Sequence, residues 1–153
     1  MTNSEDRPEE GTGFGLKRIL NKNLFFYLLD LEVKRARRYQ NFYCILLLKL
    51  KRLSNHDDEN SLQSCVQMVA NFLTGEIRES DIMGSLGENN LAVLLPYADI
   101  SAGGHVKSRL EGNLKYCDFK SMGCEVIINQ VCFPSNGTNA IDLLKKALGV
   151  EPL

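Results

Sequence analysis

The sequence is poor in the residues from which metal and redox sites are usually built. Its two histidines, His56 and His105, stand far apart, and none of its five cysteines forms a CxxC pair. A zinc site uses clustered cysteine and histidine ligands, so none is expected. Three of the cysteines, Cys44, Cys65 and Cys132, lie in apolar runs. This predicts reduced, buried thiols in a cytoplasmic protein.

The chain also lacks a long apolar run and an excess of charge of one sign. Its 18 Lys and Arg residues against 19 Asp and Glu residues give a net charge of −1, so no global field draws it to DNA or RNA. No apolar stretch approaches the ~20 residues that span a bilayer, and we expect no membrane insertion. The acidic start "MTNSEDRPEEGTG" does not have the pattern of a signal peptide.

The length of the chain fits one domain with a short extension. Residues 1–13 are expected to form a disordered acidic tail or linker, and residues 14–150 a single folded domain. The near-continuous apolar run "FYCILLLKLK" predicts a central strand that is covered on both faces. Two further apolar runs around "ENN" predict a β-hairpin.

The order of the predicted elements is helix, strand, helix, strand, strand, helix, strand, helix. This order predicts an α+β fold with a mostly antiparallel central sheet flanked by helices. The predicted helices cover residues 16–39, 61–73, 98–114 and a short segment after 138, and the predicted strands cover 42–51, 82–87, 91–96 and 124–133.

Some details of these helices can also be predicted. The spacing of leucines in the first helix indicates one apolar face, made of Leu20, Leu24, Leu28 and Leu31. We expect an N-cap near Asn60 or Ser61 for the second helix, and at Thr138 or Asn139 for the last one.

Two segments carry a resemblance to a known family. The first helix contains Asn21-Lys22, Glu32, Ala36 and Arg38, which is similar to an opening segment with an Asn-Arg pair and a later Glu-x-x-x-Ala-x-Arg. The hairpin "GSLGENNLAVLLP" is similar to the signature Arg-x-Gly-Gly-Asp-Glu-Phe-x-x-Leu-Leu-Pro. Over about residues 16–148 the chain thus resembles the GGDEF family, the diguanylate cyclase domains that make cyclic di-GMP from two GTP. The resemblance implies the nucleotidyl-cyclase-like GGDEF fold and a role in bacterial signal transduction.

The residues that would bind metal in this family are replaced. Cyclase chemistry needs divalent cations held by acids on the first central strand and in the signature. Here Lys49 and Lys51 stand at the strand positions, Asn89 and Asn90 replace the signature acids, and Glu88 replaces the second glycine. A lysine cannot ligate magnesium and repels it. The resemblance therefore implies an inactive GGDEF domain without catalytic residues, metal or cofactor.

A second family motif is retained. Cyclases of this family often carry an inhibitory Arg-x-x-Asp site five residues before the signature, together with an arginine on the helix after the hairpin. Arg78 and Asp81 match that motif, and Arg109 matches the additional arginine. An arginine can donate two hydrogen bonds to the N7 and O6 atoms of guanine or bind phosphate, and an aspartate can accept from the N–H groups of guanine. The alternative is a surface ion pair worth less than ~1 kcal/mol.

Three hypotheses of function follow from these patterns. The first is an inactive GGDEF domain that binds cyclic di-GMP through Arg78, Asp81 and Arg109 and passes the signal to a protein partner. The second is a dimerisation or interaction scaffold that binds no nucleotide, and a homodimer is compatible with either. The third, a cyclase or GTP-binding protein, is disfavoured by Lys49 and Asn89. Binding of cyclic di-GMP without magnesium would separate the first hypothesis from the others.

Overall fold

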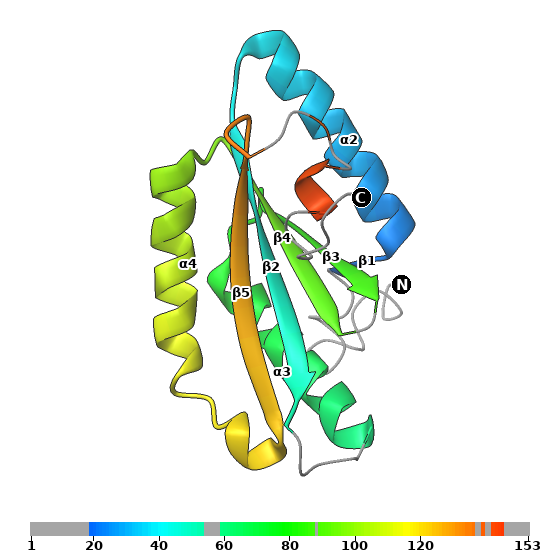
Figure 1. The fold of residues 1–153 in the computed structure, drawn as a ribbon, viewed down its shortest axis with the longest axis vertical. Coiled ribbons are helices and arrows are strands. Elements are labelled where there is room, and N and C mark those ends of the chain that lie inside the picture. The colour runs from blue at the N-terminus through cyan, green and yellow to red at the C-terminus, as the bar shows by residue number, and fades with distance from the viewer. Residues whose placement is uncertain (1–18, 54–58, 88, 137–138, 140–141, 146–153) are drawn as a thin grey trace, which may run out of the picture.

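The computed structural model describes residues 19–53, 59–87, 89–136, 139 and 142–145 (Figure 1). The predicted tail, residues 1–13, lies outside these ranges. The main elements of the protein are β1 (Ile19–Leu20), α2 (Lys22–Tyr39), β2 (Tyr43–Arg52), α3 (Glu59–Glu76), β3 (Ile82–Gly87), β4 (Asn90–Pro96), α4 (Ile100–Leu114), the 3₁₀ helix η2 (Lys120–Met122) and β5 (Cys124–Phe133). No helix among the described residues has the length and apolar character needed to cross a membrane.

The five strands form one sheet in the order β1-β3-β4-β2-β5. The short β1 runs parallel to β3, and all other neighbours are antiparallel. Strand β2 lies between β4 and β5, and its residues Tyr43–Leu48 are buried. The predicted α+β fold with a mostly antiparallel sheet is therefore confirmed, as are the central strand and the hairpin.

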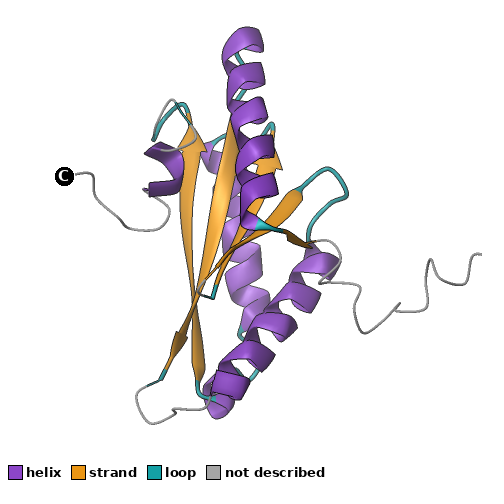
Figure 2. Ribbon diagram, turned by 90° about the vertical axis from the view of Figure 1, so that its right-hand side faces the viewer, coloured by secondary structure: helices purple, strands orange, loops and turns teal. Residues whose placement is uncertain are grey.

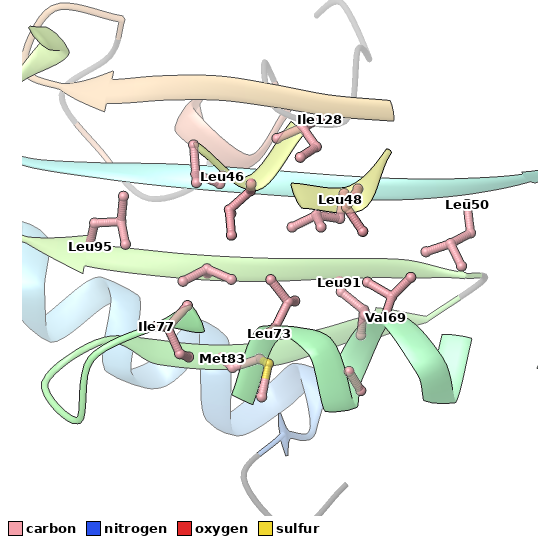
Figure 3. Packing of buried hydrophobic residues seen from close by; sticks show 14 of the residues in the cluster. Leu46, Leu48, Leu50, Val69, Leu73, Ile77, Met83, Leu91, Leu95 and Ile128 are labelled. Carbon is pink, nitrogen blue, oxygen red and sulfur yellow. The ribbon is translucent and has the colours of Figure 1, made fainter. Parts of the chain in front are cut away.

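Helices cover both faces of this sheet: α2 lies on one face, and α3 and α4 lie on the other (Figures 1 and 2). Successive side chains of β2 alternate between the two cores, as the period of a strand requires. Leu46 and Leu48 pack in the cluster formed with α3 and α4 (Figure 3), and Ile45 and Leu47 pack in the cluster formed with α2. This two-sided burial explains why the strand is apolar along most of its length.

Two glycines allow helices to approach the sheet closely. A Cβ atom at Gly84 would lie 2.4 Å from the Phe25 ring of α2, and one at Gly103 of α4 would lie 2.7 Å from Cys44 Sγ. Real Cβ atoms do not approach their neighbours so closely, so both close approaches are possible only because glycine has no side chain.

The first helix differs from its prediction in its start. Ile19 and Leu20 pair with β3 as a strand, and the helix begins only at Lys22. The side chain of Asn21 accepts a hydrogen bond of 2.8 Å from the Leu24 backbone N–H and so caps the helix. The pairing of β1 with β3 thus holds the residues just before the cap in an extended conformation.

The predicted apolar face of this helix is also wrong. The buried side chains are Phe25, Leu29, Val33 and Ala36, while Leu24 and Leu31 of the predicted face are exposed. The helix carries apolar residues on two adjoining stripes, and the stripe with the large aromatic ring of Phe25 is the one that packs on the sheet.

The cap predictions have mixed outcomes. Helix α3 begins at Glu59, so Asn60 and Ser61 lie inside it and neither is its N-cap. Near the C-terminus, Asn139 Oδ1 accepts a 2.8 Å hydrogen bond from the backbone N–H of Asp142, the bond expected of an N-cap. The alternative, Thr138, lies outside the described residues.

The prediction of reduced thiols is wrong. The structure contains two disulfides, Cys44–Cys132 between β2 and β5 and Cys65–Cys124 between α3 and β5, and Cys117 is the free cysteine. All four bonded residues are buried, including the three, Cys44, Cys65 and Cys132, whose burial the apolar runs predict. Cys44 and Cys132 are directly opposite in the β2–β5 ladder, a proximity that cannot be read from positions 88 residues apart. The cysteines consequently give no support to a reducing compartment.

Candidate functional site

The three residues proposed to bind ligand meet at one end of the sheet. The segment after α3, the end of β4 and one side of α4 surround a hollow of about 280 Å³. Its lining consists of Arg78, Asp81, Leu95, Tyr97, Ala98, Ala102, Val106 and Arg109. The structure thus brings Arg78, Asp81 and Arg109 to one hollow, although Arg109 lies on α4 and the other two lie in the turn after α3.

Arg78 and Asp81 form the two ends of a tight turn. The Asp81 backbone N–H donates to the Arg78 carbonyl oxygen at 3.0 Å, and Asp81 Oδ2 accepts from the Arg78 backbone N–H at 2.8 Å. Asp81 is only 5% exposed, whereas the Arg78 side chain is 71% exposed. The guanidinium Nη2 lies 3.7 Å from Asp81 Oδ1. The carboxylate therefore holds the turn, and the guanidinium extends toward solvent, which differs from a pair of two surface charges.

Arg109 is positioned by the end of α3. Its Nη2 atom donates to the carbonyl oxygen of Glu76 at 2.7 Å, and its Nε atom lies 3.4 Å from Glu76 Oε1. The side chain of Asn113 donates to the same carboxylate oxygen at 3.2 Å. A guanidinium has five N–H donors, so these contacts orient Arg109 and leave donors for a ligand.

Sequence reasoning missed two residues of this site, Glu76 and Tyr97. Glu76 closes α3 two positions before Arg78, but its contact with Arg109 depends on how α3 and α4 pack. Tyr97 directly follows the proline that ends β4, and it is one of the residues that line the hollow. An aromatic residue between a strand end and a helix cap was the available signal.

The lining suits a planar ligand with polar edges. Two guanidinium groups supply donors for acceptor atoms or phosphate, one buried carboxylate supplies acceptor atoms, and the remaining wall is apolar and aromatic. Ligand sites typically measure roughly 300–1,000 Å³, so a hollow of about 280 Å³ accommodates one nucleobase rather than an entire cyclic dinucleotide.

The signature turn lies at the other end of β4. Lys49 of β2 is opposite Asn90 in the ladder, and the Leu50 backbone N–H donates to the Asn89 carbonyl oxygen at 3.0 Å. Gly87 and Asn89 have φ values of +82° and +68°, the left-handed conformation that glycine and asparagine tolerate in turns.

A separate hollow of about 240 Å³ lies between this turn and α3. Its lining consists of Gln63, Val66, Gln67, Ser85, Gly87, Asn89, Asn90 and Leu91. These described side chains are neutral, so this part of the lining offers no positive charge for a triphosphate and no carboxylate for a cation.

The cyclase family implies divalent metal at this turn, and the residues present do not fit it. In such sites magnesium is held by carboxylates and by substrate phosphates. In this structure Lys49 of β2, which carries a positive charge, lies beside Asn89 and Asn90, which carry neutral amides. Within the ranges that the structure describes, no group of three or more His, Cys, Asp or Glu residues is arranged to hold a metal ion.

Comparison with known proteins relates the chain to one family. The chain matches the family described as "Diguanylate cyclase, GGDEF domain" over residues 15–147. No curated protein matches the chain significantly.

Among solved structures, the chain is similar to a DGC protein from Thermotoga maritima, with a TM-score of 0.70, 19% identity, and coverage of 88% of this chain and 93% of that one. It is similar to the GGDEF domain of DgcB from Caulobacter crescentus in complex with c-di-GMP, with a TM-score of 0.72, 12% identity and coverages of 86% and 82%. It is also similar to the diguanylate cyclase SiaD from Pseudomonas aeruginosa in complex with its activator SiaC, with a TM-score of 0.67, 16% identity and coverages of 85% and 52%. Since the family match spans most of the chain, the protein belongs to the GGDEF family of diguanylate cyclase domains.

Proposed function

We propose that this protein is a catalytically inactive GGDEF domain that binds cyclic di-GMP at the hollow formed by Arg78, Asp81 and Arg109. The observation that carries the proposal is the meeting of these three side chains in one hollow next to an exposed aromatic residue. Guanine presents acceptors on one edge and N–H donors on another, and the hollow contains partners for both. The similar DgcB domain was solved with c-di-GMP.

The absence of synthesis is supported by the signature turn. Its described side chains are amides, and the opposing strand position carries Lys49. Two-metal phosphoryl transfer needs cations to neutralise the charge that develops on the phosphates. The ammonium group of Lys49 repels those cations, and neutral amides lack the carboxylate charge that would hold them.

We also propose that the protein passes the signal to a protein partner. The similar SiaD was solved with a protein activator, SiaC. If the hollow holds one base of cyclic di-GMP, the other base stays accessible. The ligand could then join two chains at this site. A cytoplasmic setting is part of the proposal and rests on the family resemblance alone, because four of the five cysteines are in disulfides.

Calorimetric titration of cyclic di-GMP into the purified protein tests this function. We expect micromolar or tighter binding without magnesium, loss of binding in Arg78→Ala, and retention in Glu79→Ala. Glu79 is the matched control because it is exposed in the same turn but does not line the hollow. A parallel titration of GTP with magnesium should give no heat and no product.

Failure of the wild-type protein to bind cyclic di-GMP would overturn the receptor function, and equal loss in both variants would overturn the assigned site. Conversion of GTP to cyclic di-GMP would overturn the proposed inactivity.

A second candidate function is an interaction scaffold that needs no nucleotide. It is favoured by an exposed apolar stripe on α2, formed by Leu24, Tyr27 and Leu31. If this function is correct, light scattering should show an oligomer without ligand, and the substitution Tyr27→Lys should dissociate it.

A further inference from the structure

Tyr97 has an unusual backbone conformation at the edge of the hollow. Its φ is +62°, in the left-handed region that bulky residues rarely adopt. Two other non-glycine residues within the described ranges share this region: Gln40 is the C-cap of α2, and Asn89 lies in the hairpin turn. Both have ordinary local reasons for it. For Tyr97 the conformation costs energy, and residues held in this way are concentrated at ligand-binding sites.

Tyr97 is an exposed residue that also belongs to the site. It is 67% exposed, yet it lines the same hollow as Arg78, Asp81 and Arg109. Covering an aromatic ring that is exposed to water with a second apolar surface is favourable, because it removes apolar area from water. The hollow has room for one base beside it, so the ring can be covered by part of a ligand.

We propose that Tyr97 is the stacking residue of this site and covers one face of a guanine while the charged groups bind its edges and the phosphate. This inference rests on the proposed function and adds a determinant of affinity that the family motif does not contain. A stacked aromatic ring and an arginine use different parts of the base, the face and the edge, so their contributions are separable.

Substitution at this position tests the inference through opposite effects on binding and stability. Tyr97→Asn removes the ring and introduces a residue that tolerates positive φ. We expect it to weaken cyclic di-GMP binding by about 5-fold to 150-fold, the range of alanine substitutions at base-stacking residues. The same variant should melt at a higher temperature than the wild type. Tyr97→Phe keeps the ring and should bind within about threefold of the wild type.

A spectroscopic measurement detects the stacking directly. The sequence contains no tryptophan, so Tyr97→Trp introduces a single indole, whose emission can be excited apart from that of the tyrosines. Guanine that stacks on this indole should quench its emission in proportion to occupancy of the site. Tyr116→Trp is the matched control, because Tyr116 is 90% exposed and lines a different hollow. Its emission should not change with cyclic di-GMP.

The outcomes separate the two proposals. If the wild type binds cyclic di-GMP and Tyr97→Asn binds with the same affinity, or if Tyr97→Trp is not quenched at saturation, the stacking role is overturned and the receptor function stands. If the wild type does not bind, the receptor function fails, and the stacking role fails with it.

Discussion

At the scale of single residues, the three polar members of the hollow are not equivalent. Arg78 extends into solvent, Asp81 is buried and holds the backbone of its own turn, and Arg109 is anchored to Glu76. Removal of each side chain should therefore affect ligand affinity and folding stability to a different extent. Only a substitution that leaves the fold intact can assign a role in ligand binding.

Arg78 and Asp81 should respond differently to truncation. Arg78→Ala removes an exposed charge, so the free energy of unfolding should change by less than about 1 kcal/mol. Asp81→Ala leaves the backbone N–H of Arg78 without its 2.8 Å acceptor and should lower the free energy of unfolding by about 1–3 kcal/mol. Urea denaturation measures both values.

Asp81→Asn is the control for this pair. It retains a side-chain oxygen that can accept from the Arg78 N–H, so its stability should be close to that of the wild type. Equal stability of Asp81→Ala and the wild type would show that the carboxylate does not hold the turn.

Tyr43 gives a second prediction at the residue scale. Its side chain is buried against Phe133, and among the described residues no hydrogen-bond partner of its hydroxyl is found. Burial raises the pKa of Tyr43 above its ordinary value of 10, and the nearby Glu32 carboxylate adds to the rise. A free tyrosine in the unfolded chain loses its proton near pH 10, whereas the folded chain retains it. The free energy of unfolding should therefore fall as the pH rises above about 10.

Tyr43→Phe should remove this part of the pH dependence. At neutral pH it should also raise the free energy of unfolding by about 1 kcal/mol, because it eliminates a buried hydroxyl without a partner. Chemical denaturation at pH 7 and at pH 10.5 compares the two proteins. A variant that is less stable at pH 7 would indicate that the hydroxyl is satisfied in solution.

The sequence predicted part of this residue-scale picture. The spacing between Arg78, Asp81 and Gly87 was enough to identify candidate binding residues. It could not show that Asp81 is buried or that Glu76 holds Arg109, because both facts arise from tertiary packing. It missed Tyr97 because no family position drew attention to it.

At the scale of elements, close packing of α4 on the sheet depends on glycine. Gly103 of this helix faces Cys44 and the side chain of Gln130, whose Nε2 atom donates to the Ile100 carbonyl oxygen at 3.1 Å. A Cβ atom at Gly112 of the same helix would have no neighbour within 4 Å. One helix thus contains a glycine required by packing and another that packing does not require.

These two glycines make a matched prediction. Gly112→Ala should raise the free energy of unfolding by about 0.5–1 kcal/mol through higher helix propensity. Gly103→Ala should lower it by about 1–3 kcal/mol because the added methyl group overlaps Cys44. Thermal melting of both variants provides the comparison. A stabilised Gly103→Ala would mean that α4 can move away from the sheet without loss.

Element-level prediction worked where one pattern dominated. The strands were found because apolar runs end at turn residues or proline, and the hairpin because its turn contains residues that accept positive φ. The buried face of α2 was not found because two apolar stripes adjoin on that helix. The pair Ile19–Leu20 is too short to show any period, so its pairing with β3 could not be seen.

At the scale of the whole molecule, β4 connects the two sites. It begins at the altered signature turn with Asn90 and ends beside the hollow at Pro96. A strand rises about 3.4 Å per residue, so the two sites lie roughly 20 Å apart. The replaced residues of the signature turn are therefore separated from the hollow by the length of β4, as the proposed function requires.

The disulfides give the prediction for the whole chain. Both of them bind β5 to other elements, and they close long segments, with separations of 88 and 59 residues. Such a bond typically contributes about 2–4 kcal/mol by restricting the unfolded chain, so reduction should lower the urea midpoint markedly.

Thiol counting by mass spectrometry checks that prediction and the compartment together. In the folded protein the free, partly exposed Cys117 should take up one alkyl group, and unfolding without reductant should add no more. Unfolding with reductant should expose all five thiols. Protein that is alkylated at the moment of cell lysis reports the state inside the cell. If the protein from the lysed cells carries one label even after unfolding, both disulfides were formed inside the cell, which indicates oxidising conditions. If it carries five labels after unfolding without reductant, the four buried cysteines were reduced, which would favour the cytoplasm.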